Sequence, residues 1–255
     1  MEIYEKYLKR IRKDLSAVST AEKADSSRRY FPQGIHCCGA TAGDIKTIIS
    51  NFLLNHPDLT ATDILAITEY MLAWAEYNEE FLIAFGLMNK FVKLSAKRTD
   101  NFDDELLLRF EYWLEHYANN WSLVDDLCIK TLYQFLISRP HLIVKNQQWG
   151  YSEIPWCRRA SCVVWVKFIK RKIGKEIYYL DTQLIFKQCD LLLDDSDEYV
   201  QKGVGWLLKV TSVEHKDAVI SYIKNNRSRF TRPTLRYAIE KMDNESRRML
   251  LAIQP

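Results

Sequence analysis

The feature that most constrains the fold of this 255-residue chain is its scarcity of residues that interrupt helices. The chain contains only eight glycines and six prolines. So few breakers argue against a fold of short strands and tight turns, and they favour long helices joined by short loops. Apolar residues also recur at helical spacing, as in Ile45, Ile48, Ile49, Phe52 and Leu53. The sequence therefore predicts an all-α fold.

Local signals predict where individual helices begin and end. His56-Pro57-Asp58 should end the first apolar helix, and Thr60 with Asp63 has the pattern of a hydroxyl N-cap with an acid three residues on. Pro155 should lie in the first turn of another helix. Helical patterns cover residues 64–74, 81–94, 106–117, 123–137, 156–169, 182–193, 198–210 and 215–224, with a last helical region from Pro233.

These predicted helices form pairs of about 35–45 residues, a unit length typical of helical solenoids. We therefore predict a right-handed solenoid of HEAT- or armadillo-like antiparallel helix pairs with a concave, basic groove. A globular helical bundle is the competing all-α arrangement. No composition shift divides the chain, so we expect one domain over 1–255, with an N-terminal helical region at 1–40 and stacked helix pairs at 41–255.

Composition limits the cellular setting. The N-terminus is charged from Glu2 onward, unlike a signal peptide, and no apolar run approaches the ~20 residues of a membrane span. None of the six cysteines forms a Cys-x-x-Cys pair, and His36-Cys37-Cys38 lacks a second half-site for zinc. We expect a cytoplasmic, nucleoid-associated protein without a metal site or other cofactor.

The small net charge of +3 hides an uneven distribution along the chain. Acids dominate between Asp58 and Asp126, whereas bases dominate between Arg139 and Lys175 and again from Lys202 to Arg236. If the basic segments line one face, that face attracts a polyanion such as DNA. If they lie on separate helices, they are ordinary solvated surface.

Trp121 and Asp125 form the first of three local clusters. They lie four residues apart in a predicted helix, which places an indole and a carboxylate on the same stripe, one turn apart. A flat aromatic wall beside an anion suits a site that holds a sugar while positive charge develops on it. The competing reading is a core tryptophan beside a solvated acid.

The other two clusters lie later in the chain. One is Pro155-Trp156-Cys157-Arg158-Arg159-Ala160, and the other is Gln201-Lys202-Gly203-Val204-Gly205-Trp206. Each glycine in the second segment costs about 1 kcal/mol relative to alanine inside a helix. A close approach by a ligand or a neighbouring backbone would account for both glycines, and tight helix packing is the simpler of the two explanations.

In order and approximate spacing, these three clusters resemble the AlkD-like DNA alkylation repair glycosylases of the HEAT-repeat type. The Phe31-Pro32 segment fits as well, and the resemblance covers roughly residues 30–208. The chain departs from the family in two respects. Ser26 stands near the position of an N-terminal aromatic, for which Tyr30 is the substitute, and Ser122 stands where members often carry an acid.

The resemblance implies a role for each matching residue. Trp121 and Trp206 correspond to tryptophans that flank the deoxyribose of the lesion, and Asp125 to the catalytic carboxylate. Arg159 corresponds to an arginine that holds a phosphate. We add Arg158, Lys202 and Tyr30 as DNA-binding candidates. Some relatives bind DNA without excising bases.

Three functions therefore remain. The leading one is a monomeric DNA glycosylase that acts on positively charged N3- or N7-alkylated purines in duplex DNA, without a deep base-flipping pocket. The second is a non-catalytic solenoid that binds distorted or branched DNA, and the third is a helical-repeat scaffold that binds proteins. Asp125 favours the first over the second, and the basic run up to Lys175 favours either DNA-binding function over the scaffold.

Overall fold

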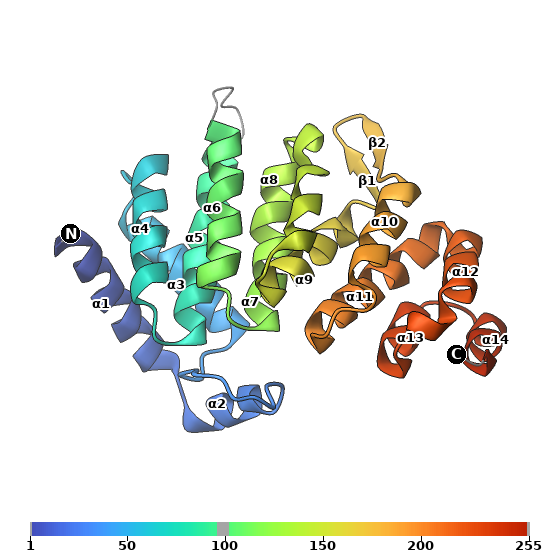
Figure 1. Ribbon diagram of the computed structural model, residues 1–255. Helices are drawn as coiled ribbons and strands as arrows, with labels where there is room; N and C mark the ends of the chain where they lie inside the picture. The colour runs from blue at the N-terminus through green and yellow to red at the C-terminus, as the bar shows by residue number, and fades with distance from the viewer. Residues whose placement is uncertain (1, 96–101, 254–255) are drawn as a thin grey trace. The chain divides into compact units, whose positions relative to one another are not determined.

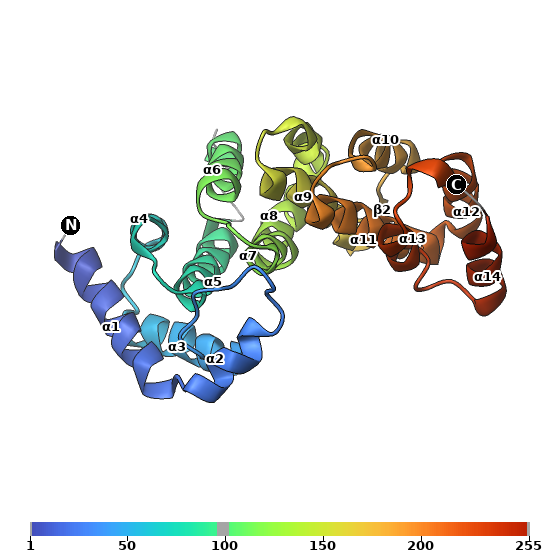
Figure 2. The same ribbon diagram turned by 60° about the horizontal axis from the view of Figure 1, so that its bottom comes forward.

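The computed structural model describes residues 2–95 and 102–253. These residues divide into two compact units with a boundary between Asp103 and Asp104, and Figures 1 and 2 show their helices. The described residues of the first unit include the helices α1 (Glu2–Val18), α2 (Ala21–Arg28), α3 (Ala42–Asn55), α4 (Ala61–Trp74) and α5 (Asn78–Ser95). The predicted all-α class is confirmed. The single-domain organisation, the hand of the solenoid and the basic groove stay predictions.

Capping residues explain where two helices of the first unit begin. Thr60 accepts a hydrogen bond from the Asp63 amide while Asp63 accepts one from the Thr60 amide, which confirms the predicted helix start. Thr41 and Asp44 form a second reciprocal pair at the start of α3. Two of the four otherwise unpaired amide groups at each helix start are satisfied in this way.

A buried carboxylate fixes the segment that leads into α3. Glu79 is 3% exposed and accepts hydrogen bonds from the amides of Cys38, Gly39 and Ala40 at 2.8–3.2 Å. Gly39 has φ of +91°, and a Cβ there would lie 2.3 Å from the carbonyl oxygen of Thr20. Only glycine fits this close crossing.

The second unit carries the three sequence clusters. Its longer helices are α6 (Phe102–His116), α9 (Pro155–Val163), α10 (Thr182–Leu192), α11 (Glu198–Glu214), α12 (Lys216–Asn225) and α14 (Asn244–Ala252). The shorter elements are α7 (Trp121–Asp126), the π-helix η1 (Leu127–Leu132), α8 (Tyr133–Ile137), α13 (Arg232–Ala238) and the 3-10 turns η2 (Pro140–Leu142), η3 (Lys145–Tyr151), η4 (Val164–Lys167) and η5 (Arg227–Arg229). Pro155 begins α9 as predicted.

Helix α11 lies at the centre of the packing in this unit. It contacts α9 on one side and α13 on the other, and the three lie side by side in both views (Figures 1 and 2). Trp113, Trp149 and Trp165 are each at most 1% exposed. Three of the seven tryptophans thus serve the core, and the aromatic excess is partly structural.

The structure differs from the sequence expectations in three places. The helix predicted over 156–169 is an α-helix only to Val163 and is followed by the 3-10 helix η4. A β-hairpin of β1 (Lys170–Ile173) and β2 (Glu176–Tyr179) separates η4 from α10. Gly174 turns it with φ of +61°, a conformation that glycine adopts without strain. The predicted continuous helix over 123–137 is interrupted by the π-helix η1. No helix within the described residues is long and apolar enough to span a membrane.

Candidate active site

The first turn of α7 positions the Trp121–Asp125 pair. Asn120 is the N-cap, and its side-chain oxygen accepts hydrogen bonds from the amides of Ser122 and Leu123 at 3.0 and 3.2 Å. Leu123 is fully buried in the core and anchors the helix. Trp121 and Asp125 are both partly exposed and lie one turn apart on the helix. The expected shared stripe is therefore present.

Asp125 is held by Arg159 of α9. Arg159 donates from Nε to Oδ1 at 3.0 Å and from Nη2 to Oδ2 at 2.9 Å, a bidentate arrangement. Its Nη1 donates to the carbonyl oxygen of Tyr199 on α11 at 2.6 Å. The side chains of Arg159 and Asp125 are 5% and 15% exposed. Three elements thus meet at the Arg159 guanidinium, which holds the carboxylate.

Burial and charge act against each other at this carboxylate. Burial raises the pKa of Asp125 above its usual value, and the nearby Asp126 adds to the rise, whereas the charge and hydrogen bonds of Arg159 oppose it. Burial likewise raises the pKa of Asp126, and its ion pair with Lys130 opposes the rise. Each carboxylate therefore has one cationic partner that favours its ionised form.

The two glycines of α11 are explained by helix packing. An added Cβ at Gly203 would lie 3.4 Å from Cγ of Arg159, and one at Gly205 would lie 3.2 Å from the carbonyl oxygen of Thr234. Gly203 therefore faces α9, and Gly205 faces α13. Trp206 follows on the same helix, one turn beyond Gly203, and is partly exposed.

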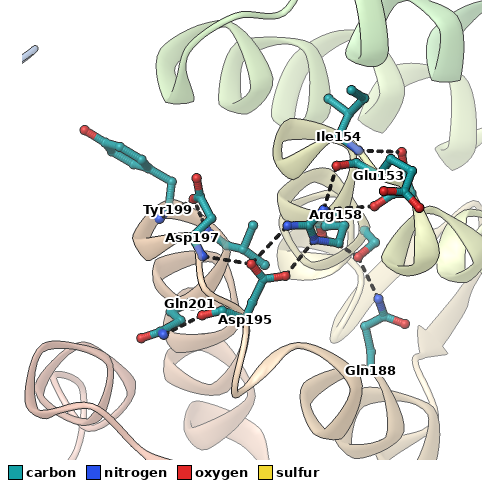
Figure 3. Close-up of polar contacts among 11 residues, drawn as sticks. Glu153, Ile154, Arg158, Gln188, Asp195, Asp197, Tyr199 and Gln201 are labelled. Carbon is teal, nitrogen blue, oxygen red and sulfur yellow. Dashed lines mark hydrogen bonds and ion pairs between the residues drawn. The ribbon is translucent and has the colours of Figure 1, made fainter. Parts of the chain in front are cut away.

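Arg158 forms a second bidentate ion pair. It donates from Nε and Nη2 to Asp195 at 2.6 and 3.1 Å, and its Nη1 bonds to the carbonyl oxygens of Ser152 and Glu153 (Figure 3). Figure 3 shows Arg158 directed at Asp195, in the segment before α11. The Arg158 side chain, 17% exposed, joins α9 to that segment. Its proposed contact with DNA stays a prediction.

The remaining candidates are more exposed. Lys202 forms an ion pair with Glu198 at 2.7 Å, and its Nζ lies 4.5 Å from the ring centroid of Tyr199. The ring of Tyr199 in turn contacts Trp156, with centroids 5.5 Å apart. Tyr30 belongs to the first unit and is 70% exposed. Its role in the site stays a prediction.

One neighbour of the ion pair had no sequence signal. Burial raises the pKa of Tyr237 on α13, with opposing contributions from Lys209 and Arg159 and a further rise from Asp125. Tyr237 is therefore electrostatically close to the pair. Lys209 also lies 4.5 Å from its ring centroid. More than a hundred residues separate Tyr237 from Asp125, and no local motif could have joined them.

A separate group of possible metal ligands contains Glu111, Glu115 and Cys157, whose ligand atoms lie within 4.8 Å of one another. Burial raises the pKa of Cys157 to about 12. A metal binds the thiolate form of cysteine, which this environment disfavours. The group shares no residue with the Asp125–Arg159 pair.

Residues 11–242 match the family of DNA alkylation repair enzymes, and the chain belongs to this family. Its fold is similar to a predicted DNA alkylation repair enzyme from Enterococcus faecalis (TM-score 0.72, 15% identity, covering 89% of this chain and 97% of that one). It is also similar to AlkD2 from Streptococcus mutans (TM-score 0.61, 18% identity, 94% and 99%).

A further structure with a similar fold is the alkylpurine DNA glycosylase AlkC from Pseudomonas fluorescens, bound to DNA that contains an abasic site analog. Its TM-score is 0.54 at 15% identity, over 98% of this chain and 67% of that one. A comparison with curated protein sequences found no match. At these identities the solved structures establish the fold alone.

Proposed function

We propose that the protein is a DNA glycosylase that hydrolyses the N-glycosidic bond of positively charged N3- or N7-alkylated purines in duplex DNA. The single observation that carries this proposal is the Asp125 carboxylate, held bidentately by Arg159 one turn from Trp121. Membership of the alkylation repair family supports the substrate class. The neighbour AlkC, bound to DNA with an abasic site analog, is consistent with the expected product.

The reaction needs little acid catalysis because the alkylated base already carries a positive charge. The bond between C1′ and the base nitrogen breaks, and its electron pair neutralises the leaving base. Positive charge moves to the sugar as an oxocarbenium ion, which the Asp125 carboxylate stabilises. Water then forms a bond to C1′ and loses a proton to Asp125 or to solvent.

The tryptophans and the basic residues serve binding in this proposal. The indole faces of Trp121 and Trp206 attract a cationic sugar, each by about 0.5–2 kcal/mol. Arg159 orients Asp125, and its contact with a phosphate through the remaining N–H groups is part of the proposal. Arg158, Lys202 and Tyr30 are the further candidates for contact with the DNA backbone. The lesion needs no deep pocket because the chemistry takes place at the sugar.

The second candidate function is recognition of distorted DNA without excision. Trp121 and the basic residues would serve it equally well, so only the carboxylate of Asp125 discriminates between the two. We further propose that the protein acts as a monomer in the bacterial cytoplasm, on the nucleoid, and needs no metal or cofactor. A protein-binding scaffold is the third candidate.

The decisive experiment measures release of 7-methylguanine and 3-methyladenine from methylated duplex DNA. The wild-type protein should release base, and Asp125→Asn should be greatly slowed while binding is retained. A wild-type protein that binds this DNA tightly and releases nothing would establish the second function instead. DNA affinity that does not change between low and physiological salt would favour the scaffold.

A further inference from the structure

Two cations of the second unit lie over one tyrosine ring, and a third lies near them. Tyr133 is the first residue of α8. Nζ of Lys167, at the end of η4, lies 4.6 Å from its ring centroid, and Cζ of Arg171, on β1, lies 5.0 Å from it. Lys130 of the π-helix is near enough to affect the pKa of Lys167. The cations come from three elements that are separate in the sequence.

The ring is part of a rigid aromatic stack beneath the hairpin. Tyr133 packs against Phe168 at a centroid distance of 5.4 Å, and Phe168 meets the edge of Tyr178 at 6.4 Å. Tyr178 is the cross-strand partner of Arg171, so both side chains lie on the same face of the hairpin. This stack sets the position of Arg171 over Tyr133.

The cluster carries an excess of positive charge. Within residues 2–95 and 102–253, neither Lys167 nor Arg171 is paired with a carboxylate. Lys167 donates instead to the carbonyl oxygen of Ile129 at 2.7 Å. Burial lowers the pKa of Lys167, and the charges of Arg171 and Lys130 lower it further. An anion seated here would relieve this repulsion.

Two members of the cluster, Lys130 and Tyr133, lie on the same helical segment as the candidate active site. Asp126, next to Asp125, is the ion-pair partner of Lys130. Tyr133 is eight residues beyond Asp125, with the π-helix between them. One strand of B-DNA carries a phosphate about every 3.4 Å of helix axis. A strand held at Asp125 therefore offers several phosphates over the length of this segment.

We propose that Lys167 and Arg171 form a second phosphate-binding site on the ring of Tyr133, with Lys130 adding positive charge nearby while it is paired with Asp126. This site binds the DNA backbone beside the lesion and is distinct from the Asp125–Arg159 pair. The planar fork of arginine suits a phosphate, and the two lysines add point charges. The proposal rests on the proposed function only in taking DNA as the ligand. On the opposite face of the hairpin, Lys170 lies outside the cluster and is paired with Glu214 at 2.8 Å.

That difference supplies a matched control. Arg171→Ala and Lys170→Ala each remove one positive charge from the same strand, but only the first removes a charge from the Tyr133 cluster. Binding of an unmodified duplex is measured from low to physiological salt. Arg171→Ala should weaken binding about tenfold, as expected for loss of one charged contact, and flatten the slope of log K against log salt by about 0.9. Lys170→Ala should leave both nearly unchanged.

Three further variants test the site independently of the arginine. Lys167→Met keeps the apolar stem and should reproduce the loss seen in Arg171→Ala. Tyr133→Phe, which keeps the ring, should bind like the wild type, whereas Tyr133→Leu should weaken binding. Thermal unfolding of each variant shows whether the fold is retained.

The results separate this inference from the proposed function. If the wild type excises alkylated bases but Arg171→Ala and Lys170→Ala bind DNA equally, the proposed phosphate site is wrong while the proposed glycosylase activity is supported. If the wild type releases no base, yet Arg171→Ala alone loses affinity for DNA, the proposed phosphate site is supported while the proposed glycosylase activity is wrong. Variants that lose binding to vesicles of anionic phospholipid, with DNA binding intact, would assign the site to a lipid surface and overturn the inference.

Discussion

Arg159 binds both oxygens of Asp125 with its Nε and Nη2 and the carbonyl oxygen of Tyr199 with its Nη1. The candidate catalytic carboxylate is therefore fixed against α9 and α11 before any substrate binds. Preorganised charge of this kind is the arrangement that stabilises a developing cation without reorganisation in the transition state. The family resemblance implied that Arg159 holds a phosphate, whereas in the structure its guanidinium binds the Asp125 carboxylate.

The carboxylate itself is the first target for mutation. Asp125→Asn keeps the shape of the side chain but removes its negative charge, so excision should fall at least about a hundredfold, in line with the loss of one preorganised electrostatic group. Release of methylated bases under single-turnover conditions measures the rate. Binding to the same DNA is the control, and a variant that loses binding as well as excision would make Asp125 a structural residue.

The pH profile should report the environment of Asp125. Its pKa is raised by burial, and the ionised form is the active one. Excision should therefore decline on the acid side at a pH above the usual value of 3.8. Arg159→Met removes the charge that opposes the rise, so the acid limb should move to still higher pH. An unchanged acid limb in this variant would show that another group controls the profile.

Arg159→Met should also destabilise the fold. Removing one partner of a buried ion pair leaves the other uncompensated, at a cost of about 3–5 kcal/mol. Urea unfolding measures this loss, and excision must be assayed where the variant is folded. Full stability in Arg159→Met would contradict the buried geometry of the pair.

The tryptophans should contribute through their π faces. Trp206→Ala should slow excision about 2- to 30-fold if the indole supplies 0.5–2 kcal/mol to the cationic sugar. Trp206→Phe keeps an aromatic face and should retain more activity. Equal loss in both variants would instead indicate a role for the indole nitrogen or for its size.

The two glycines of α11 should respond differently to alanine. At Gly203 the nearest contact of a new Cβ is 3.4 Å, an ordinary van der Waals distance, whereas at Gly205 it is 3.2 Å to a backbone oxygen. Gly203→Ala should therefore gain up to about 1 kcal/mol of helix propensity, and Gly205→Ala should gain less or lose stability. Chemical denaturation compares them, and the reverse order would show that the packing has been misread.

The first unit has its own pH dependence. Hydrogen bonds from Thr41, backbone first, together with Lys23 hold the pKa of Asp44 at about 2. Since this folded-state value lies below the ordinary 3.8, the stabilisation is present above pH 3.8 and is lost as the pH falls toward 2. Asp44→Asn should remove this dependence. Melting curves between pH 2 and 5 test the difference.

The sequence predicted the features that depend on local signals. Thr60 and Pro155 marked helix starts correctly because capping is decided within one turn. The stripe shared by Trp121 and Asp125 followed from spacing alone. The family, too, was recognised from short clusters, and the match over residues 11–242 confirms it.

Features that depend on contacts between distant residues could not be predicted from the sequence. The hydrogen-bond partners of Arg159 depend on where α7 and α11 meet α9. The sequence alone therefore could not show whether Arg159 binds a phosphate or a carboxylate. The hairpin around Gly174 was missed because its strands are short and rich in charge. Tyr237 joins the site only through the packing of α13 on α11.

The π-helix that follows Asp125 has a consequence for the evolution of the chain. A single wide turn of this kind contains one residue more than the α-helical ladder needs. A wide turn takes up its extra residue locally, so deleting one residue from Leu127–Leu132 should restore regular α-helical spacing and leave α7 and α8 close to their present directions. Asp125 would still face Arg159. This segment is therefore a place where the chain can gain or lose one residue without moving the candidate active site.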